Sequence, residues 1–221
     1  MNDRTIGRAG FLGILGAGAL GLFFAKDLTG VLDRAVPSSV SAIVPTDGWR
    51  IYTVASMPNL DPLAYRLRVS GLVAAPQSFS LADLKAMPRA EQVSDFHCVT
   101  GWSVQNVRWA GVRIGDLLRA AGATKGVQAL RFVSAEVPYD DSLTLKQALL
   151  PDVMLAYEMD GKPLSRAHGA PVRLVMPEMY GYKSVKWVDH VELGGTAQPG
   201  YWEQHGYDAD AWIGRSNGLG V

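Results

Sequence analysis

Apolar and polar positions after about residue 48 follow both strand-like and helix-like patterns. Tyr65–Val69 alternates and stops at Gly71, which predicts a strand. Ser80 precedes a helical pattern with Asp83 at its third position, which predicts a short capped helix. The same signals predict strands over 51–54, 130–133, 172–176 and 185–193 and helices over 114–121 and 143–150. Because helices and strands do not alternate strictly, we expect an α+β fold with a mixed β-sheet and flanking helices.

The first 30 residues have a different pattern from the rest of the chain. An apolar run from Ala9 to Ala25 follows Arg4 and Arg8 and contains five glycines. As a helix, a run of this length extends about 25 Å, slightly less than a bilayer core of about 30 Å. We interpret residues 1–30 as a membrane anchor or signal segment. The flanking arginines place the following domain on the extracytoplasmic side.

Residues 31–48 contain two prolines, three serines and Gly48, which break any periodicity and predict a linker, so we expect the folded domain at 49–221. Hydrophobic residues make up 48% of the chain and charged residues 19%, which is typical of a globular protein rather than a disordered one. The formal net charge is zero and no long basic run occurs, so we expect no nucleic-acid partner.

Cys98 is the single cysteine of the chain, so it cannot form an intramolecular disulfide. It stands among aromatic residues within residues 95–103. From the residues alone, it is a buried small side chain, a reactive thiol or a metal ligand. A zinc site would need histidine partners, but none of their spacings matches a zinc-binding motif. The four histidines are His97, His168, His190 and His205.

A second cluster, within Leu155–Val188, places Arg, Lys, Ser and Gly at expected turns and strand ends. Arg173 offers a two-pronged donor and Lys186 a point charge, while the backbone of residues 181–184 offers N–H donors. This inventory suits an anion such as a phosphate monoester. The alternative is that these cations face solvent, as charged side chains usually do.

Together, the two clusters resemble the molybdopterin-binding domain of the sulfite oxidase and nitrate reductase family, which includes the catalytic subunit of periplasmic methionine-sulfoxide reductase. The resemblance covers about residues 45–210 and is strongest over Phe96–Leu118 and Leu155–Leu193. It implies a sulfite-oxidase-type molybdopterin-binding domain and a molybdenum–molybdopterin cofactor. Cys98 is implied to be catalytic as the thiolate on the metal, and Tyr207 to be catalytic at the metal pocket. The residues implied to bind the cofactor are His168, Arg173, Ser184, Val185 and Lys186.

Two departures from the family pattern concern the substrate. Sulfite oxidases carry an Arg-Asn-His run where this chain has residues 54–56, Val-Ala-Ser, and two arginines where it has Trp102 and Ser103. A buried sulfite dianion needs compensating cations. We therefore expect a molybdopterin-dependent oxidoreductase with two-electron, oxygen-atom-transfer chemistry on a small S-oxide or N-oxide-like substrate.

The family and the expected anchor together imply a haem or quinone redox partner at the membrane. Two alternatives remain open. One is a non-catalytic binding or assembly module that has kept the fold without the metal. The other is a carbohydrate-binding module that uses the aromatic residues of 201–212.

Overall fold

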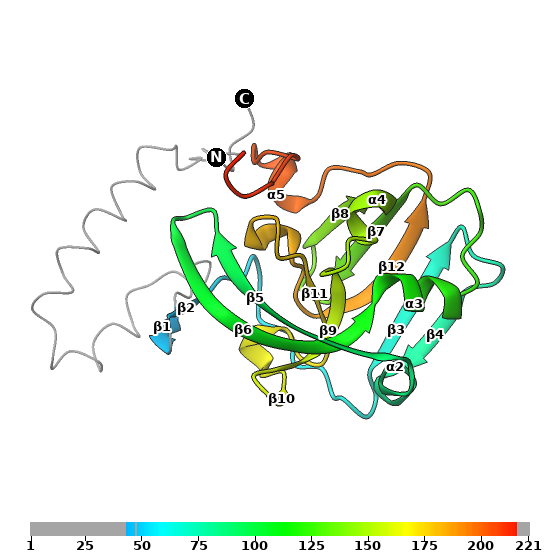
Figure 1. The fold of residues 1–221 in the computed structure, drawn as a ribbon, viewed down its shortest axis with the longest axis horizontal. Coiled ribbons are helices and arrows are strands. Elements are labelled where there is room, and N and C mark those ends of the chain that lie inside the picture. Colours follow the sequence, from blue (N-terminus) through cyan, green and yellow to red (C-terminus); the bar gives the residue numbers. More distant parts are fainter. Residues whose placement is uncertain (1–42, 47, 216–221) are drawn as a thin grey trace, which may run out of the picture. The chain divides into compact units, whose positions relative to one another are not determined.

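The computed structural model describes residues 43–46 and 48–215 (Figure 1). The chain divides after Ser41 into two units, and the described residues belong to the second, residues 42–221. The predicted anchor or signal segment lies outside the described residues. Within residues 43–46 and 48–215, no helix has the length and apolar character needed to cross a membrane.

The described residues form twelve strands, four α-helices and two 3₁₀-helices, η2 and η3. The strands are β1 (Ile43–Thr46), β2 (Trp49–Ile51), β3 (Arg66–Gly71), β4 (Gln77–Ser80), β5 (Arg89–Cys98), β6 (Trp102–Arg113), β7 (Ala129–Ser134), β8 (Asp140–Thr144), β9 (Met154–Met159), β10 (Lys162–Pro163), β11 (Arg173–Val175) and β12 (Val188–Gly194). The helices are α2 (Leu81–Ala86), α3 (Ile114–Ala120), α4 (Leu145–Ala148), η2 (Arg166–His168), η3 (Gly181–Lys183) and α5 (Tyr201–Gln204).

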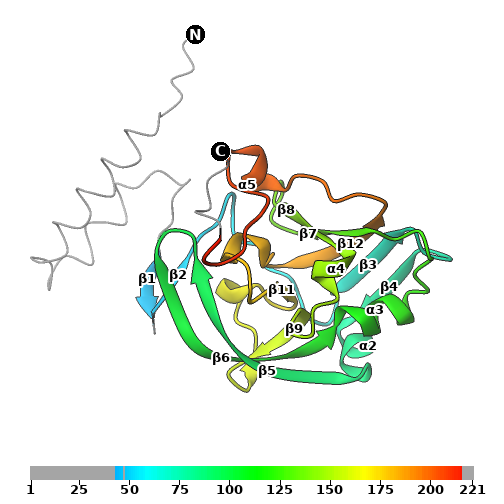
Figure 2. The ribbon, with the colours of Figure 1, turned by 45° about the horizontal axis from the view of Figure 1, so that its top comes forward.

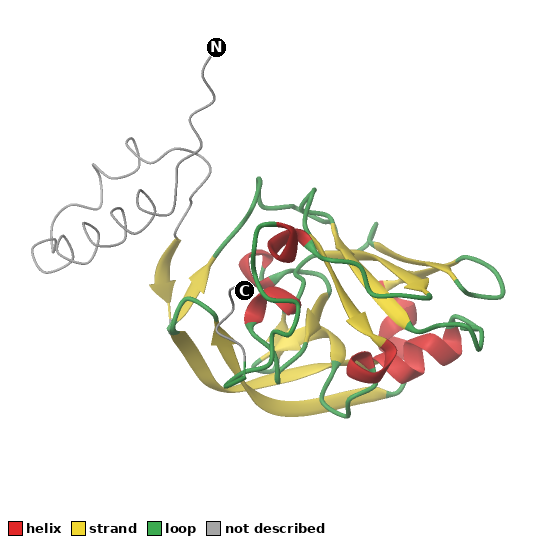
Figure 3. Ribbon diagram, turned by 90° about the horizontal axis from the view of Figure 1, so that it is seen from above, coloured by secondary structure: helices red, strands yellow, loops and turns green. Residues whose placement is uncertain are grey.

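Two five-stranded sheets form the body of the described domain. One sheet has the order β10-β9-β6-β5, with β11 paired to β9, and the other has the order β4-β3-β12-β7-β8. Strands β3 and β12 run parallel, whereas the neighbouring pair β12 and β7 is antiparallel. A separate antiparallel pair joins β1 and β2. Figure 3 shows that the helices are short beside the strands, which confirms the α+β class with a mixed sheet.

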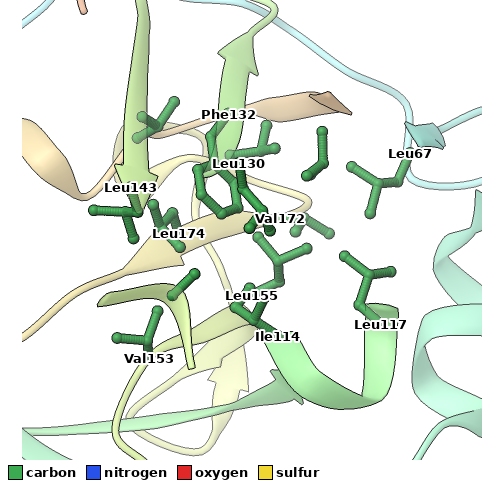
Figure 4. Close-up of a cluster of buried hydrophobic side chains, with 14 of the residues drawn as sticks. Leu67, Ile114, Leu117, Leu130, Phe132, Leu143, Val153, Leu155, Val172 and Leu174 are labelled. Carbon is green, nitrogen blue, oxygen red and sulfur yellow. The ribbon is translucent and has the colours of Figure 1, made fainter. Parts of the chain in front are cut away.

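The larger core joins residues of both sheets with α2 and α3 (Figure 4). Strand β9 contributes Leu155 and Tyr157 to this core, and Met154 and Ala156 to a second, smaller core. Residues 154–157 are therefore buried on both faces of the strand, which explains why this stretch is apolar without alternation. The second core also holds aromatic residues of β2 and of the β5–β6 hairpin, and it lies beside the candidate site.

The hairpin of β5 and β6 is long and curved (Figures 1 and 2). Its ladder contains a bulge on β6, since Ser94 pairs with Val107 but Phe96 pairs with Val104. Asn106 takes the extra position with a left-handed φ of 57°, and its N–H donates to the Asp95 carboxylate at 2.8 Å. As a result, the side chains of β6 that enter the second core change phase at the bulge. They are Trp102 and Val104 before it, and Val107 and Trp109 after it.

Several predicted elements match the structure closely. The capped helix is α2, in which the Ser80 hydroxyl accepts from the N–H of Asp83 at 3.1 Å. The helix predicted over 143–150 is wrong at its start, because Leu143 lies in β8 and α4 begins only at Leu145. Strand β1 lies within the range that the sequence suggested to be a linker.

Candidate functional site

Cys98 is the last residue of β5, at the tip of the hairpin, and it is partly buried. Its sulfur lies 3.1 Å from the Thr100 hydroxyl. Trp102 pairs with Cys98 across the hairpin, so their side chains share one face of the ribbon. His97 points to the opposite face, where its ring lies 2.8 Å from the Ser103 hydroxyl. The adjacent cysteine and histidine are therefore separated by the strand.

Tyr207 lies in the segment that follows α5. Its ring packs against the rings of Tyr182 and Trp202, with centroid separations of 5.5 and 5.1 Å. Burial raises the pKa of Tyr207, and the nearby Cys98 thiol and Tyr52 hydroxyl raise it further. Tyr207 and Cys98 are more than a hundred residues apart in sequence, but they lie near enough in the fold for Cys98 to affect the pKa of Tyr207. A raised pKa keeps the phenol protonated and able to donate a hydrogen bond.

Arg173 is buried next to His168 and Ser184, and only 2% of its surface is exposed. Its guanidinium donates to the backbone carbonyls of His168 and Ser184, both at 3.2 Å, and of Leu174 at 3.3 Å. It also lies over the rings of Phe96 and Trp109. Burial lowers the pKa of Arg173 to about 10, so it remains a cation at neutral pH. None of the ion pairs in the described part of the chain includes it.

His168 lies at the end of η2, and its ring contacts that of Trp49 at a centroid separation of 4.8 Å. Burial lowers the pKa of His168 to about 4, with further contributions from Arg173 and Lys186. The imidazole is therefore neutral at pH 7. Its Nδ1 atom is buried and has no hydrogen-bond partner within the described residues. Such an atom is costly to leave unpaired, and a bound ligand would satisfy it.

Lys186 is half-buried, and its ammonium donates to the Tyr52 carbonyl at 2.6 Å. Burial lowers the pKa of Lys186, and Arg173 lowers it further, while Glu136 opposes this change. Gly169 (φ 99°) packs closely here, because an added Cβ would lie 2.9 Å from the Lys186 Cβ and 3.1 Å from the Trp187 nitrogen. The segment after His168 and the segment at Lys186 thus lie against each other.

Ser184 and Val185 are buried, and their available groups differ from those the sequence suggested. The Ser184 hydroxyl accepts from the N–H of Met176 at 3.0 Å, so its own hydrogen is left to donate. Val185 is fully enclosed in the main core, so its side chain cannot contact a ligand. The expectation that the backbone of residues 181–184 binds an anion is wrong at two positions. The N–H groups of Lys183 and Ser184 bond to carbonyls within the same turn.

Sequence reasoning missed two residues that join these groups. The Tyr52 ring stacks on Trp102 at a centroid separation of 6.5 Å, while its carbonyl accepts from Lys186. Tyr52 therefore links the cysteine side of the site to the cation side. The Glu136 carboxylate accepts from the N–H groups of Val54 and Ala55, at 2.7 and 3.1 Å. A β-prone run contained Tyr52, but no sequence signal pointed to Glu136.

The donor set fits a molybdenum–pterin cofactor with a phosphate. A thiol is available as a soft metal ligand at Cys98. Arg173 is a buried cation, and the pKa values of His168 and Lys186 are lowered in part by its charge. An anion would relieve this concentration of positive charge and would find an unpaired atom at His168.

Residues 54–202 match the family model of the oxidoreductase molybdopterin binding domain. The chain belongs to the molybdopterin-binding oxidoreductase family. Members of this family bind a molybdenum–molybdopterin cofactor, and this chain is an oxidoreductase of that type. Its fold is the sulfite-oxidase-like molybdopterin domain that the sequence predicted.

Several members of the family are similar to this chain over most of its length. The oxidoreductase YuiH of Bacillus subtilis is 39% identical, over 69% of this chain and 77% of that protein. The "putative protein-methionine-sulfoxide reductase subunit YedZ1" of Azospira oryzae is 35% identical, over 72% of this chain and 58% of that protein. Sulfite oxidase of Arabidopsis thaliana is 30% identical over 76% and 51%. The sulfane dehydrogenase SoxCD of Paracoccus pantotrophus matches in structure with a TM-score of 0.64 and 25% identity, over 74% and 46%. The chain thus spans only about half the length of the last three.

Proposed function

We propose that this molybdopterin oxidoreductase removes the oxygen atom from a small S-oxide or N-oxide, with Cys98 as the metal ligand. The reaction consumes two electrons and two protons and releases the reduced substrate and water. The cofactor supplies the two-electron redox chemistry when it is bound. The chain's own residues bind and orient the substrate and exclude water.

The observation that supports this substrate class is that the side chains next to Cys98 (Thr100, Trp102 and Tyr207) are uncharged. Trp102 faces the same side of the hairpin as Cys98, and Tyr207 lies near enough to Cys98 for that thiol to raise the pKa of its hydroxyl. This chain has no arginine at residues 102–103 or at residues 54–56, where sulfite oxidases carry arginines. A doubly charged sulfite ion would lose its hydration there without compensation, whereas an S-oxide needs only a hydrogen-bond donor for its oxygen. We assign that donor to Tyr207.

The remaining site residues are assigned to the cofactor. We assign Lys186 and His168 to contacts with its phosphate or pterin, and the unpaired Nδ1 of His168 supports this assignment. Ser184 offers a hydroxyl hydrogen and Val185 only its backbone. Arg173 stabilises the arrangement of the site, because its guanidinium donates to the backbone carbonyls of both His168 and Ser184.

Electrons must come from a redox partner, for which we propose a haem or quinone protein at a membrane. The name of the Azospira relative as a subunit supports the idea that such a domain works with a second protein. In this proposal, residues 1–30 anchor or export the domain, which acts on the extracytoplasmic side.

Metal analysis of the purified protein tests the proposal. The protein is produced in a host that makes the cofactor, and wild type is compared with Cys98→Ser and His97→Ala. We expect equimolar molybdenum and S-oxide reduction in wild type and in His97→Ala, whose side chain faces away from the site. Cys98→Ser should fold normally but lose activity. Metal-free, folded wild type would favour a binding or assembly module, and sulfite oxidation in place of S-oxide reduction would refute the substrate assignment.

A further inference from the structure

Three charged side chains meet in the protein interior next to the candidate site. Lys183 of η3 binds Asp141 of β8 and Glu203 of α5, with 2.5 Å from its nitrogen to each carboxylate. The exposed fractions of the three side chains are 4%, 2% and 6%, respectively. We call these residues the buried ion triad. It joins three elements that are distant in sequence, and only one of them, α5, leads to Tyr207.

The triad is connected to Tyr207 through the segment 200–208. The second Glu203 oxygen accepts from the N–H of Gly200 at 3.0 Å, which fixes the start of α5. At the other end of the segment, the Tyr182 hydroxyl donates to the Asp208 carbonyl at 2.6 Å. Tyr182 and Lys183 are neighbours on η3, so this one turn holds the segment on both sides of Tyr207.

The packing of Gly200 shows how closely α5 approaches the triad. A Cβ added to Gly200 would lie 2.8 Å from the Asp141 carboxylate carbon and from the Asp140 carbonyl oxygen. The entry to α5 therefore fits against β8 with no room for a side chain.

Stability alone does not account for the triad. Removing three charges from water costs several kcal/mol per ion, and apolar replacements of similar size are often as stable. A buried ammonium that must contact two carboxylates instead restricts how their elements can be arranged. Here the restricted element is α5, and Tyr207 follows its last residue, Gln204, after only two intervening residues.

We propose that the buried ion triad is a positioning device for Tyr207, with Lys183 holding α5 in the arrangement that packs the Tyr207 ring against Tyr182. This inference rests on the proposed function, in which Tyr207 contacts the substrate. Lys183 is then a positioning residue that touches neither substrate nor cofactor.

Hydrogen–deuterium exchange of the purified full chain tests the positioning without measuring turnover. Lys183→Met leaves two buried carboxylates without a cation, so we expect faster exchange over 200–208 and unchanged exchange in β3. Glu203→Gln should give a smaller effect in the same segment. Asp140→Asn is the matched control, because Asp140 lies next to Asp141 but pairs with Arg131. It should leave the exchange of 200–208 unchanged.

Exchange over 200–208 at the wild-type rate in Lys183→Met would overturn the proposal. So would a rise in exchange spread evenly over the domain in both Lys183→Met and Glu203→Gln.

Turnover separates this proposal from the proposed function. Lys183→Met should lower kcat about tenfold or more, because small displacements of a catalytic group have such effects. In a Tyr207→Phe background it should have no further effect, since the triad acts only through that hydroxyl. Additive losses would overturn the positioning role. A fully active Tyr207→Phe enzyme would refute the assignment of Tyr207 and leave the exchange results to decide the structural part.

Discussion

Gly181→Ala should weaken the contact between the Cys98 hairpin and the Ser184 segment. Gly181 begins η3, and a Cβ added there would lie 2.2 Å from the tip of the Phe96 ring. The ring cannot easily move away, because it packs against Trp49 at 4.9 Å and Trp102 at 5.7 Å between centroids. Forcing a methyl group into a packed core costs about 1–3 kcal/mol. For a domain of this size, that lowers Tm by about 2–12 °C.

Thermal unfolding and molybdenum content measure this effect together. The expected result is a lower Tm and a lower metal content in Gly181→Ala, because both Cys98 and the cofactor-binding residues shift relative to each other. Gly195→Ala is the matched control, since nothing lies within 4 Å of its added Cβ. Phe96→Leu in the Gly181→Ala background should recover part of the loss. A Gly181→Ala protein with wild-type Tm and metal content would refute the packing argument.

Two further predictions concern His168 and Arg173. The pKa of His168 is about 4 in the fold and about 6.5 when unfolded, so the unfolded chain takes up the proton first. The free energy of unfolding should therefore fall as pH drops from about 6.5 to 4, and urea titrations should show a weaker dependence for His168→Gln; an equal dependence would contradict the burial of this ring. Arg173→Lys should lose about 2–4 kcal/mol in urea unfolding, since an ammonium cannot span three carbonyls. Unchanged stability would show that those bonds contribute little.

The parts of the fold that the sequence predicted are those with local signals. Helix α2 has its cap and its apolar spacing within seven residues, and β3 alternates without interruption. Strand β6 could not be found by alternation, because the bulge at Asn106 reverses the phase of its buried positions. Strand β9 could not be found either, because both of its faces are buried and no alternation remains.

The sequence indicated which residue types belong to the candidate site, but not which side chains contact one another there. The resemblance identified Cys98 and Lys186 as members of one site, and the structure places both beside Tyr52 and its neighbours. Residue type alone does not distinguish Lys186 from Lys183, three residues away, although Lys183 is bound by two buried carboxylates. Those carboxylates come from strands and helices that only the tertiary fold brings together.

The bulge in β6 also has a mechanical consequence. Four residues of β6, from Asn106 to Trp102, span about 13 Å. Trp102 pairs with Cys98, so a change in the bend at Asn106 moves Cys98 with it. Bulges bend a strand, so a change of about 10° in that bend would displace the sulfur by about 2 Å. Removing the extra residue would leave the same side chains of β6 facing the core, but it would change the bend and so move Cys98. The position of Cys98 thus depends on the length of a strand, and insertions or deletions there would alter the site without exchanging any residue in it.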